Sequence, residues 1–478
     1  MNRYLKLLKN FFLMVIGQFS SKLLSFLLVP LYTYILSTEE YGSFELITTT
    51  VTLLTPLLTL VIAEGVMRFC LDEKYDNRQV LTIGLVIVLC GSLLLFALYP
   101  LTLVIEVLRG HFFWLFIFFF SSNLHTVMSQ YLKGTGDVKF FTVCGVISTA
   151  VTLGLNILFL VVLDMGIVGY MAAYAITHIV IVGVICVKIN VIKSITNPFK
   201  IEKSTYQEIL KYTCPMIPNS LSWWINNSLD KYMITWIIST AAMGVYSVAY
   251  KIPSIITIFV TLFMSAFQIS AVENFGSDES KQFFGRVYKS FSSFCLIVSS
   301  ALILGAELIA KILYQKDFFA AWPMSCVLIF SVVFHSMSGC LGTVYTSAKR
   351  TKFLFYSTAI GALINIVLNF ILIHKMGIMG AAVATLISNV CVWVFRLISA
   401  RKMLNFPINM LTDILSYVFI TVEIILVVTD NLYAFLFAVL AFVVVCVINI
   451  MQFVKSGMLS SLKLAIAKKP KTEEGTQD

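Results

Sequence analysis

The chain has 478 residues, of which 59% are hydrophobic and only 12% are charged. Soluble domains carry about 25% charged residues, so this composition excludes an ordinary cytosolic enzyme. Lys and Arg outnumber Asp and Glu by 34 to 24, and in so hydrophobic a chain this excess indicates membrane topology rather than nucleic-acid binding.

The sequence predicts an all-α membrane protein with fourteen spans, each long enough to cross a hydrocarbon core of about 30 Å. In chain order the predicted spans are 11–36, 43–69, 80–108, 112–132, 140–163, 167–189, 212–238, 243–272, 287–313, 319–346, 353–373, 377–400, 409–429 and 432–454. Of the 34 Lys and Arg residues, 27 fall in segments on the side of the N-terminus, four on the opposite side and three within spans. This asymmetry predicts that both termini are cytoplasmic.

Two halves of the chain carry similar segments in the same order. Residues 35–44 match residues 237–246, and residues 165–169 match residues 376–380. Chance similarity between apolar helices is the alternative explanation. If the match is a duplication, each copy has six spans and enters the membrane from the same side, which predicts two parallel repeats around a central cleft. The predicted parts are an N-terminal lobe (1–200), a C-terminal lobe (201–402), an additional helix pair (403–456) and a polar cytoplasmic tail (457–478).

Polar side chains recur inside the predicted spans. A charged side chain at membrane depth costs about 2.5–3.5 kcal/mol, so such groups normally face a cavity. The first and seventh spans, which correspond in the two copies, each carry a polar stripe at helical spacing. We therefore expect a polar cleft lining of Gln18, Ser25, Asn219 and Asn226. The candidate substrate-binding residues are Lys22, Arg68, His125, Asp230, Lys231, Lys251, His335 and Arg396.

Basic groups outnumber acids among these candidates, and Asp230 is the clearest acid. A cleft of that sign favours an anion such as a diphosphate. Structural alternatives remain: Lys251 and Arg396 could snorkel to an interface, and Lys231 could be neutralised by Asp230 or another neighbour. The two histidines could instead form hydrogen bonds between helices.

Several features of the sequence bear on chemistry and on bending. The ten cysteines are scattered without metal-ligand spacing, and no P-loop, H-E-x-x-H or G-x-S-x-G motif occurs. No cofactor or metal is therefore expected, and the chain is predicted not to be an enzyme. Prolines in the first, second, seventh and eighth spans predict bends there. Glu64 and Arg68, one helical turn apart, are expected to form an ion pair.

Five segments carry a resemblance through their arrangement along the chain: Asn10 to Gly42 (with Pro30-Leu31 and Glu40-Tyr41-Gly42), Glu64 to Phe69, Leu210 to Pro218, Leu229 to Tyr232, and Gly244 to Ile252. With these segments the chain resembles the Wzx-type polysaccharide flippases of the bacterial inner membrane. These proteins belong to the multidrug/oligosaccharidyl-lipid/polysaccharide exporter superfamily. Arg68, Asp230, Lys231 and Lys251 stand at family-like positions, whereas depth and pseudo-symmetry alone suggest the other candidates.

The resemblance implies a multi-pass transporter of the bacterial inner membrane. Its substrate would be an undecaprenyl-diphosphate-linked oligosaccharide repeat unit, flipped to the outer leaflet by alternating access for capsule, O-antigen or a related surface polysaccharide. Membrane lipids, a polysaccharide polymerase and chain-length machinery are the implied partners, with no nucleic acid. The coupling ion is open between Na⁺ and H⁺.

Two further functions within the superfamily are an ion-coupled multidrug/cation antiporter and a lipid II flippase. The antiporter should place carboxylates in a first-half cavity, and the sequence shows none at mid-depth. A membrane enzyme such as a polysaccharide polymerase is disfavoured because the outer loops are short.

Overall fold

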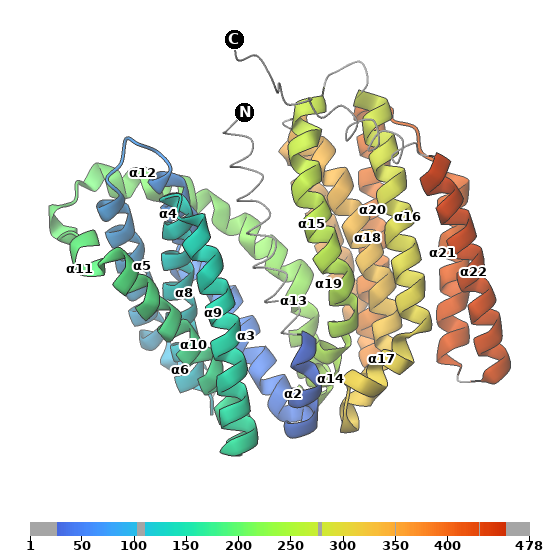
Figure 1. The fold of residues 1–478 in the computed structure, drawn as a ribbon, viewed down its shortest axis with the longest axis horizontal. Helices are drawn as coiled ribbons and strands as arrows, with labels where there is room; N and C mark the ends of the chain where they lie inside the picture. Colours follow the sequence, from blue (N-terminus) through green and yellow to red (C-terminus); the bar gives the residue numbers. More distant parts are fainter. Residues whose placement is uncertain (1–25, 103–109, 276–279, 349, 430, 456–478) are drawn as a thin grey trace, which may run out of the picture. The chain divides into compact units, whose positions relative to one another are not determined.

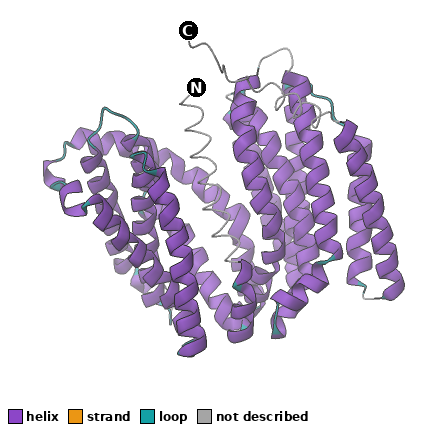
Figure 2. Ribbon diagram, in the orientation of Figure 1, coloured by secondary structure: helices purple, strands orange, loops and turns teal. Residues whose placement is uncertain are grey.

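The computed structural model describes residues 26–102, 110–275, 280–348, 350–429 and 431–455. All regular elements in these ranges are helices, and no strand occurs among them (Figure 2). The first α-helices are α2 (Val29–Ile35), α3 (Thr38–Leu58), α4 (Ile62–Cys70), α5 (Asn77–Ala97), α6 (Tyr99–Thr102), α8 (Phe112–Gly134), α9 (Val138–Asn156), α10 (Gly166–Ile189), α11 (Val191–Ser194), α12 (Lys203–Thr213), α13 (Ile217–Ile237) and α14 (Thr240–Ala249). The later ones are α15 (Lys251–Asn274), α16 (Ser280–Leu304), α17 (Ala306–Leu313), α18 (Trp322–Ser347), α19 (Thr351–Met376), α20 (Ile378–Met403), α21 (Met410–Val428) and α22 (Leu432–Lys455).

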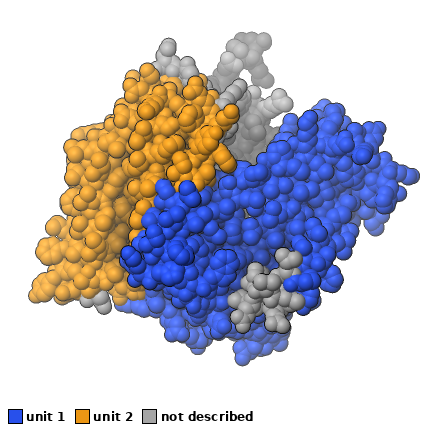
Figure 3. All heavy atoms as spheres, turned by 180° about the vertical axis from the view of Figure 1, so that it is seen from behind, with its two compact units in different colours: residues 1–251, 311–321, 362–381 blue, residues 252–310, 322–361, 382–478 orange. Residues whose placement is uncertain are grey.

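Contacts divide the chain into two compact units (Figure 3). Unit 1 comprises residues 1–251, 311–321 and 362–381, and unit 2 comprises residues 252–310, 322–361 and 382–478. Unit 1 extends beyond residue 200 because α13 and α14 pack against α3. The predicted lobes are defined by sequence repetition rather than by contacts, and they stay a prediction.

The helices match the predicted spans closely. Ten of the described helices are long and apolar enough to cross a membrane, and the number rises to twelve if each of two bent helix pairs counts as one span. Of the two other predicted spans, 11–36 lies mostly outside the described residues. The span predicted at 212–238 corresponds to the helix α13, which is long enough to span a membrane but is not apolar enough to count among these candidates. Its polar stripe includes Asp230, with Lys231 beside it.

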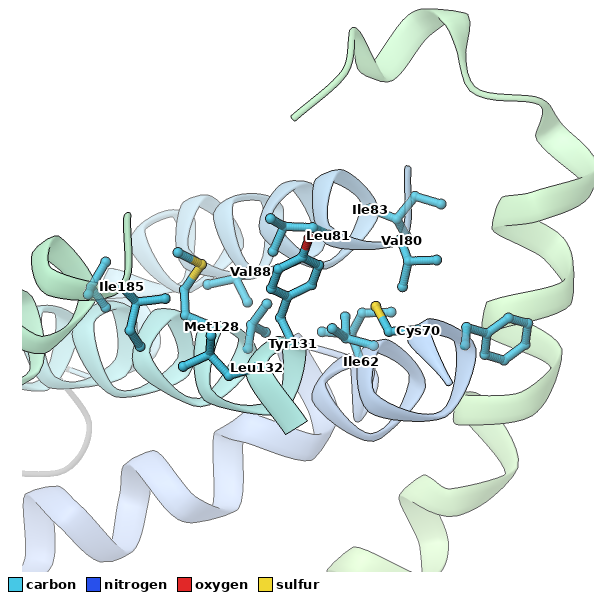
Figure 4. Packing of buried hydrophobic residues seen from close by; sticks show 14 of the residues in the cluster. Ile62, Cys70, Val80, Leu81, Ile83, Val88, Met128, Tyr131, Leu132 and Ile185 are labelled. Carbon is cyan, nitrogen blue, oxygen red and sulfur yellow. The ribbon is translucent and has the colours of Figure 1, made fainter. Parts of the chain in front are cut away.

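The buried core of unit 1 is formed by apolar side chains on several helices. Ile62 of α4, Leu81 of α5, Leu132 of α8 and Ile185 of α10 lie in one buried cluster (Figure 4). By contrast, only 11% of the apolar stretch within Val138–Val162 is buried. Outward-facing apolar helices of this length are suited to contact with lipid.

The predicted bend in the second span is present. The helices α3 and α4 form a pair bent by 60°, with Pro56 in the last turn of α3. Leu60 and Val61, between the two helices, have φ of 55° and 56°. A β-branched residue rarely adopts this left-handed conformation, so the break is held by its surroundings. The helices α14 and α15 form the second bent pair, with Pro253 in the first turn of α15.

Glycines bring α3 and α14 into very close contact. A Cβ atom added to Gly42 would lie 2.1 Å from the carbonyl oxygen of Thr240, and one added to Gly244 would lie 2.0 Å from that of Thr38. The two contacts are reciprocal, because Gly42 and Thr38 of α3 correspond to Gly244 and Thr240 of α14 in the matched segments. A two-fold relation between equivalent helices produces this exchange of partners.

The matched segments also share local backbone structure. Ser37 caps the N-terminus of α3 and Ser239 caps that of α14, each accepting a hydrogen bond from a backbone N–H three residues later. Gly166 and Gly377, at the starts of α10 and α20, have φ of +52° and +60°. Equivalent positions therefore fold in the same way, and eight of the 15 matched residues are identical.

Candidate functional site

Four ionisable side chains gather in unit 1 where α3, α13 and the start of α15 meet. We call Glu45, Asp230, Lys231 and Lys251 the charge cluster. The Nζ atom of Lys231 lies 2.8 Å from Oε2 of Glu45, and Nζ of Lys251 lies 3.8 Å from Oε1. The side chains of Glu45 and Lys231 are only 14% and 18% exposed. One carboxylate therefore holds two lysines in a largely desolvated place.

Asp230 is buried beside this ion pair and is held by tyrosines. The hydroxyl of Tyr246 donates a hydrogen bond of 2.7 Å to Oδ2, and that of Tyr250 lies 3.4 Å from the same oxygen. Asp230 accepts a hydrogen bond from the backbone N–H of Lys231, whereas the ammonium group of Lys231 turns to Glu45. The neighbour that neutralises Lys231 is thus Glu45, which lies 186 residues away in the sequence.

Aromatic side chains surround the charge cluster. The hydroxyl of Tyr41 donates to Glu45 at 3.3 Å, and Nζ of Lys251 lies 5.8 Å from the centre of the Tyr41 ring. On the same side of α3, the indole N–H of Trp224 donates to the carbonyl oxygen of Thr49, and the ring of Trp224 packs on Tyr232. Such amphipathic rings offer apolar faces together with hydrogen-bonding edges.

The charge balance of the cluster differs from the expected basic excess. Two lysines face two carboxylates, so the described part of the cluster is neutral overall. The expected excess depends on Lys22, which lies outside the described residues, as do Gln18 and Ser25.

A cavity of about 440 Å³ lies within unit 1 between α3, α8 and α10. Its lining side chains are hydroxyl-bearing, aromatic and apolar, with one amide and one imidazole. They are Phe44, Thr48, Val51, Thr52, Thr55, Phe118, Ser122, Asn123, Thr126, Tyr174 and His178. No Asp, Glu, Lys or Arg occurs among these lining residues. The cavity is therefore uncharged, and its wall is mainly apolar with a few hydroxyl, amide and imidazole groups.

A histidine pair lies at the edge of this cavity. The predicted candidate His125 stacks on His178, with ring centres 5.3 Å apart. Ser129 lies 3.4 Å from Nε2 of His125, and Ser121 lies 3.5 Å from Nδ1 of His178. His178 was not predicted as a site residue, and its place within the predicted span 167–189 is the signal that could have identified it.

Other predicted residues lie apart from the charge cluster. Arg68 is exposed on α4 and lies 4.0 Å from Asp72. The expected Glu64–Arg68 ion pair is wrong, because Glu64 accepts instead from Gln130 of α8. On α13, the predicted lining residues differ: Asn219 is exposed, whereas Asn226 is half-buried and donates to Ser222.

Two predicted residues belong to unit 2. Arg396 of α20 is only 5% exposed, and its guanidinium donates to Ser357, Thr358 and the carbonyl oxygen of Ser338 at 2.8–2.9 Å. It is therefore fixed between helices rather than extended to an interface. His335 lies on α18 with an exposed side chain.

Two family models and two archaeal proteins match this chain. The family model described as polysaccharide biosynthesis protein matches residues 7–269, and the MatE model matches residues 215–371. An uncharacterised membrane protein of Methanocaldococcus jannaschii is 24% identical over 83% of this chain and 99% of its own length. A probable low-salt glycan biosynthesis flippase of Haloferax volcanii is 22% identical over 38% of this chain and 39% of its own length.

Solved structures show the same fold. The lipid II flippase MurJ in an inward closed conformation aligns with a TM-score of 0.67 at 17% identity, covering 94% of this chain and 99% of that one. An inward-facing multidrug resistance MATE transporter of the MOP superfamily also gives 0.67, at 14% identity over 80% of this chain and 94% of that one.

Proposed function

The chain belongs to the polysaccharide biosynthesis protein family, a family of MOP-superfamily transporters, and we propose that it flips a lipid-linked oligosaccharide. The proposed substrate is an undecaprenyl-diphosphate-linked repeat unit, moved from the cytoplasmic to the outer leaflet. Its destination would be capsule, O-antigen or a related surface polysaccharide. The proposed location is a bacterial cytoplasmic membrane, although the relatives named above are archaeal.

The charge cluster is the observation that carries this proposal. Lys231 and Lys251 share Glu45 as their partner, so an arriving diphosphate would meet two ammonium groups held close together. Ammonium groups bind phosphate oxygens through strong charge-assisted hydrogen bonds. The hydroxyls of Tyr246 and Tyr250 and the ring of Trp224 are suited to the hydroxyl groups and apolar faces of sugars. Lys22 would add a further positive charge.

The proposed path is a central cleft between two parallel six-helix lobes that alternate in access. In this proposal the protein has fourteen spans, with an additional helix pair at the C-terminal end and both termini in the cytoplasm. The reciprocal contact between Gly42 and Gly244 supports the repeat. The lipid tail of the substrate would stay in the bilayer while its head passes through the cleft.

The antiporter is the second candidate function, and Glu45 is the observation that favours it. Glu45 is a carboxylate in the first half of the chain, where a cation antiporter requires one. However, Glu45 is already neutralised by two lysines, and the cavity between α3, α8 and α10 has no carboxylate among its lining residues. A cation therefore finds no carboxylate in the cavity lining and finds Glu45 already paired, which supports the flippase.

The test is glycan export in cells that depend on this chain. We expect Lys22→Ala combined with Lys231→Ala to abolish surface glycan while the protein remains in the membrane. Lys74→Ala is the matched control, because Lys74 is an exposed lysine that pairs with Glu208 outside the spans. Surface glycan at the wild-type level in the double variant would contradict the proposal.

A further inference from the structure

The helix α21 carries two carboxylates that point into the protein. Asp413 and Glu423 are only 1% and 0% exposed, although α21 is apolar enough to span a membrane. In unit 2, α21 lies side by side with α22 (Figure 1), and α16 packs against both. Ten residues separate the two carboxylates, which places them about 15 Å apart along the helix axis.

Glu423 has one hydrogen-bond partner and no cation. The hydroxyl of Ser300 on α16 donates to its Oε2 atom, and its Oε1 atom is buried without a partner. Two titratable groups that interact electrostatically with it are the thiols of Cys326 on α18 and Cys446 on α22. None of the Lys, Arg and His side chains that the structure describes forms an ion pair with Glu423.

Asp413 is more extensively bound but also keeps one oxygen unpaired. Ser292 of α16 donates to Oδ1 at 3.4 Å, and Gln452 of α22 donates to the same atom at 3.1 Å. Its Oδ2 atom is buried without a partner. Of the ionisable groups around it, Tyr288 and Lys289 lie on α16 and Tyr417 lies on α21. Among the residues that the structure describes, Lys289 forms no ion pair with Asp413.

A ladder of amides and hydroxyls continues this network between α21 and α22. Asn449 donates to Ser416 at 2.9 Å, one turn from the contact between Gln452 and Asp413. The Oδ1 atom of Asn449, a side chain only 1% exposed, is also without a partner. Three acceptor oxygens around α21 and α22 thus lack a donor. Two of them belong to carboxylates, and a proton bound there removes the unpaired negative charge.

An ionised carboxylate in this place would be costly. Burying an unpaired charge costs far more than burying the neutral acid, so such a group takes up a proton instead. The described residues contain no group of three or more His, Cys, Asp and Glu side chains that could hold a metal ion. We propose that Glu423 and Asp413 form a proton-binding site in the helix pair of α21 and α22. Each carboxylate gains one proton and becomes a neutral acid; no other bond is made or broken.

This site lies on helices that follow the two matched halves of the sequence. It is separate from the charge cluster in its residues, so protonation there can be altered without changing the lysines that we assign to the substrate. That the proton is coupled to transport rests on the proposed function, whereas the proton-binding site itself does not.

Infrared spectroscopy of the purified full chain in lipid nanodiscs tests the site. We expect a protonated-carboxyl carbonyl band at neutral pH, with one component lost in Glu423→Gln and another in Asp413→Asn. Ser300→Ala keeps the carboxyl but removes its hydrogen-bond donor, so the Glu423 component should move to higher frequency. Glu202→Gln is the control, because Glu202 is exposed at the start of α12. A neutral-pH spectrum without the band, or a band identical in all variants, would overturn the site.

Transport by the reconstituted protein separates this inference from the proposed function. With wild-type protein in vesicles, we expect an imposed pH gradient to change the rate of lipid-linked oligosaccharide transfer, and Glu423→Gln to abolish that response. An intact infrared band without any transfer would refute the flippase and leave the proton-binding site standing. Transfer whose response to the gradient is unchanged in Glu423→Gln would overturn the coupling.

Discussion

Replacing Gly42 or Gly244 by alanine perturbs the close contact between α3 and α14. The added Cβ would lie 2.1 or 2.0 Å from a backbone carbonyl oxygen, whereas non-bonded carbon atoms prefer about 3.5–4.0 Å. The helices must therefore separate by more than about 1 Å. Overpacking typically costs about 1–3 kcal/mol, and the upper part of that range applies because the backbone cannot rotate away. The helix propensity of alanine offsets up to about 1 kcal/mol, so we expect each variant to lose about 2 kcal/mol.

The assay is denaturant unfolding in mixed detergent micelles, followed by tryptophan fluorescence. Gly145→Ala in α9 is the matched control, since nothing lies within 4 Å of its added Cβ; it should be neutral or slightly stabilising. The double variant should lose less than the sum of the single losses, because both substitutions separate the same two helices. If Gly42→Ala is as stable as Gly145→Ala, the reasoning about the α3–α14 contact is refuted.

Three further predictions concern the charges and the cavity. Lys231→Met should cost up to about 3 kcal/mol of unfolding free energy, because it leaves the largely buried Glu45 with only the longer contact to Lys251. Lys231→Met with Glu45→Gln should recover most of this loss in the same unfolding assay, and equal stability of the two variants would contradict the ion pair. Ser122→Leu should fill part of the cavity in unit 1 and lower glycan export without lowering protein level, and unchanged export would show that substrate does not use the cavity. Outside the spans, hydrogen bonds from Tyr75 and Lys74 lower the pKa of Glu208. Its ionised carboxylate therefore adds a small stabilisation of the folded protein above the unfolded pKa of about 4.3. This stabilisation is lost as the pH falls through the lower folded pKa. The unfolding midpoints of wild type and Glu208→Gln should therefore converge in acid, and a difference that grows in acid would be inconsistent with this shift.

The helices could be predicted from the sequence because long apolar runs leave the chain few other structures. The predicted spans 112–132 and 167–189 agree with α8 and α10 to within two residues at each end. The resemblance to Wzx-type flippases is confirmed by the family match, and with it the prediction of a transporter rather than an enzyme.

The contacts of the charge cluster could be predicted only in part. Lys231 and Lys251 were candidates, but Glu45 was missed even though an acid inside a predicted span is itself a functional signal. Its partner choice depends on the packing of α3 against α13, and no local pattern in the sequence encodes that contact. The same reason applies to Asp413 and Glu423, whose serine partners on α16 are more than 100 residues away.

The central claim concerns which substrate the charge cluster serves, and reconstitution tests it most directly. Purified protein in vesicles would be supplied with a fluorescent undecaprenyl-diphosphate-linked oligosaccharide on one leaflet, and its appearance on the other would be measured. The account predicts transfer by wild-type protein and a loss of at least tenfold when Lys231 and Lys251 are both replaced by alanine, with Lys74→Ala unchanged. Transfer at the wild-type rate without the two lysines would contradict it.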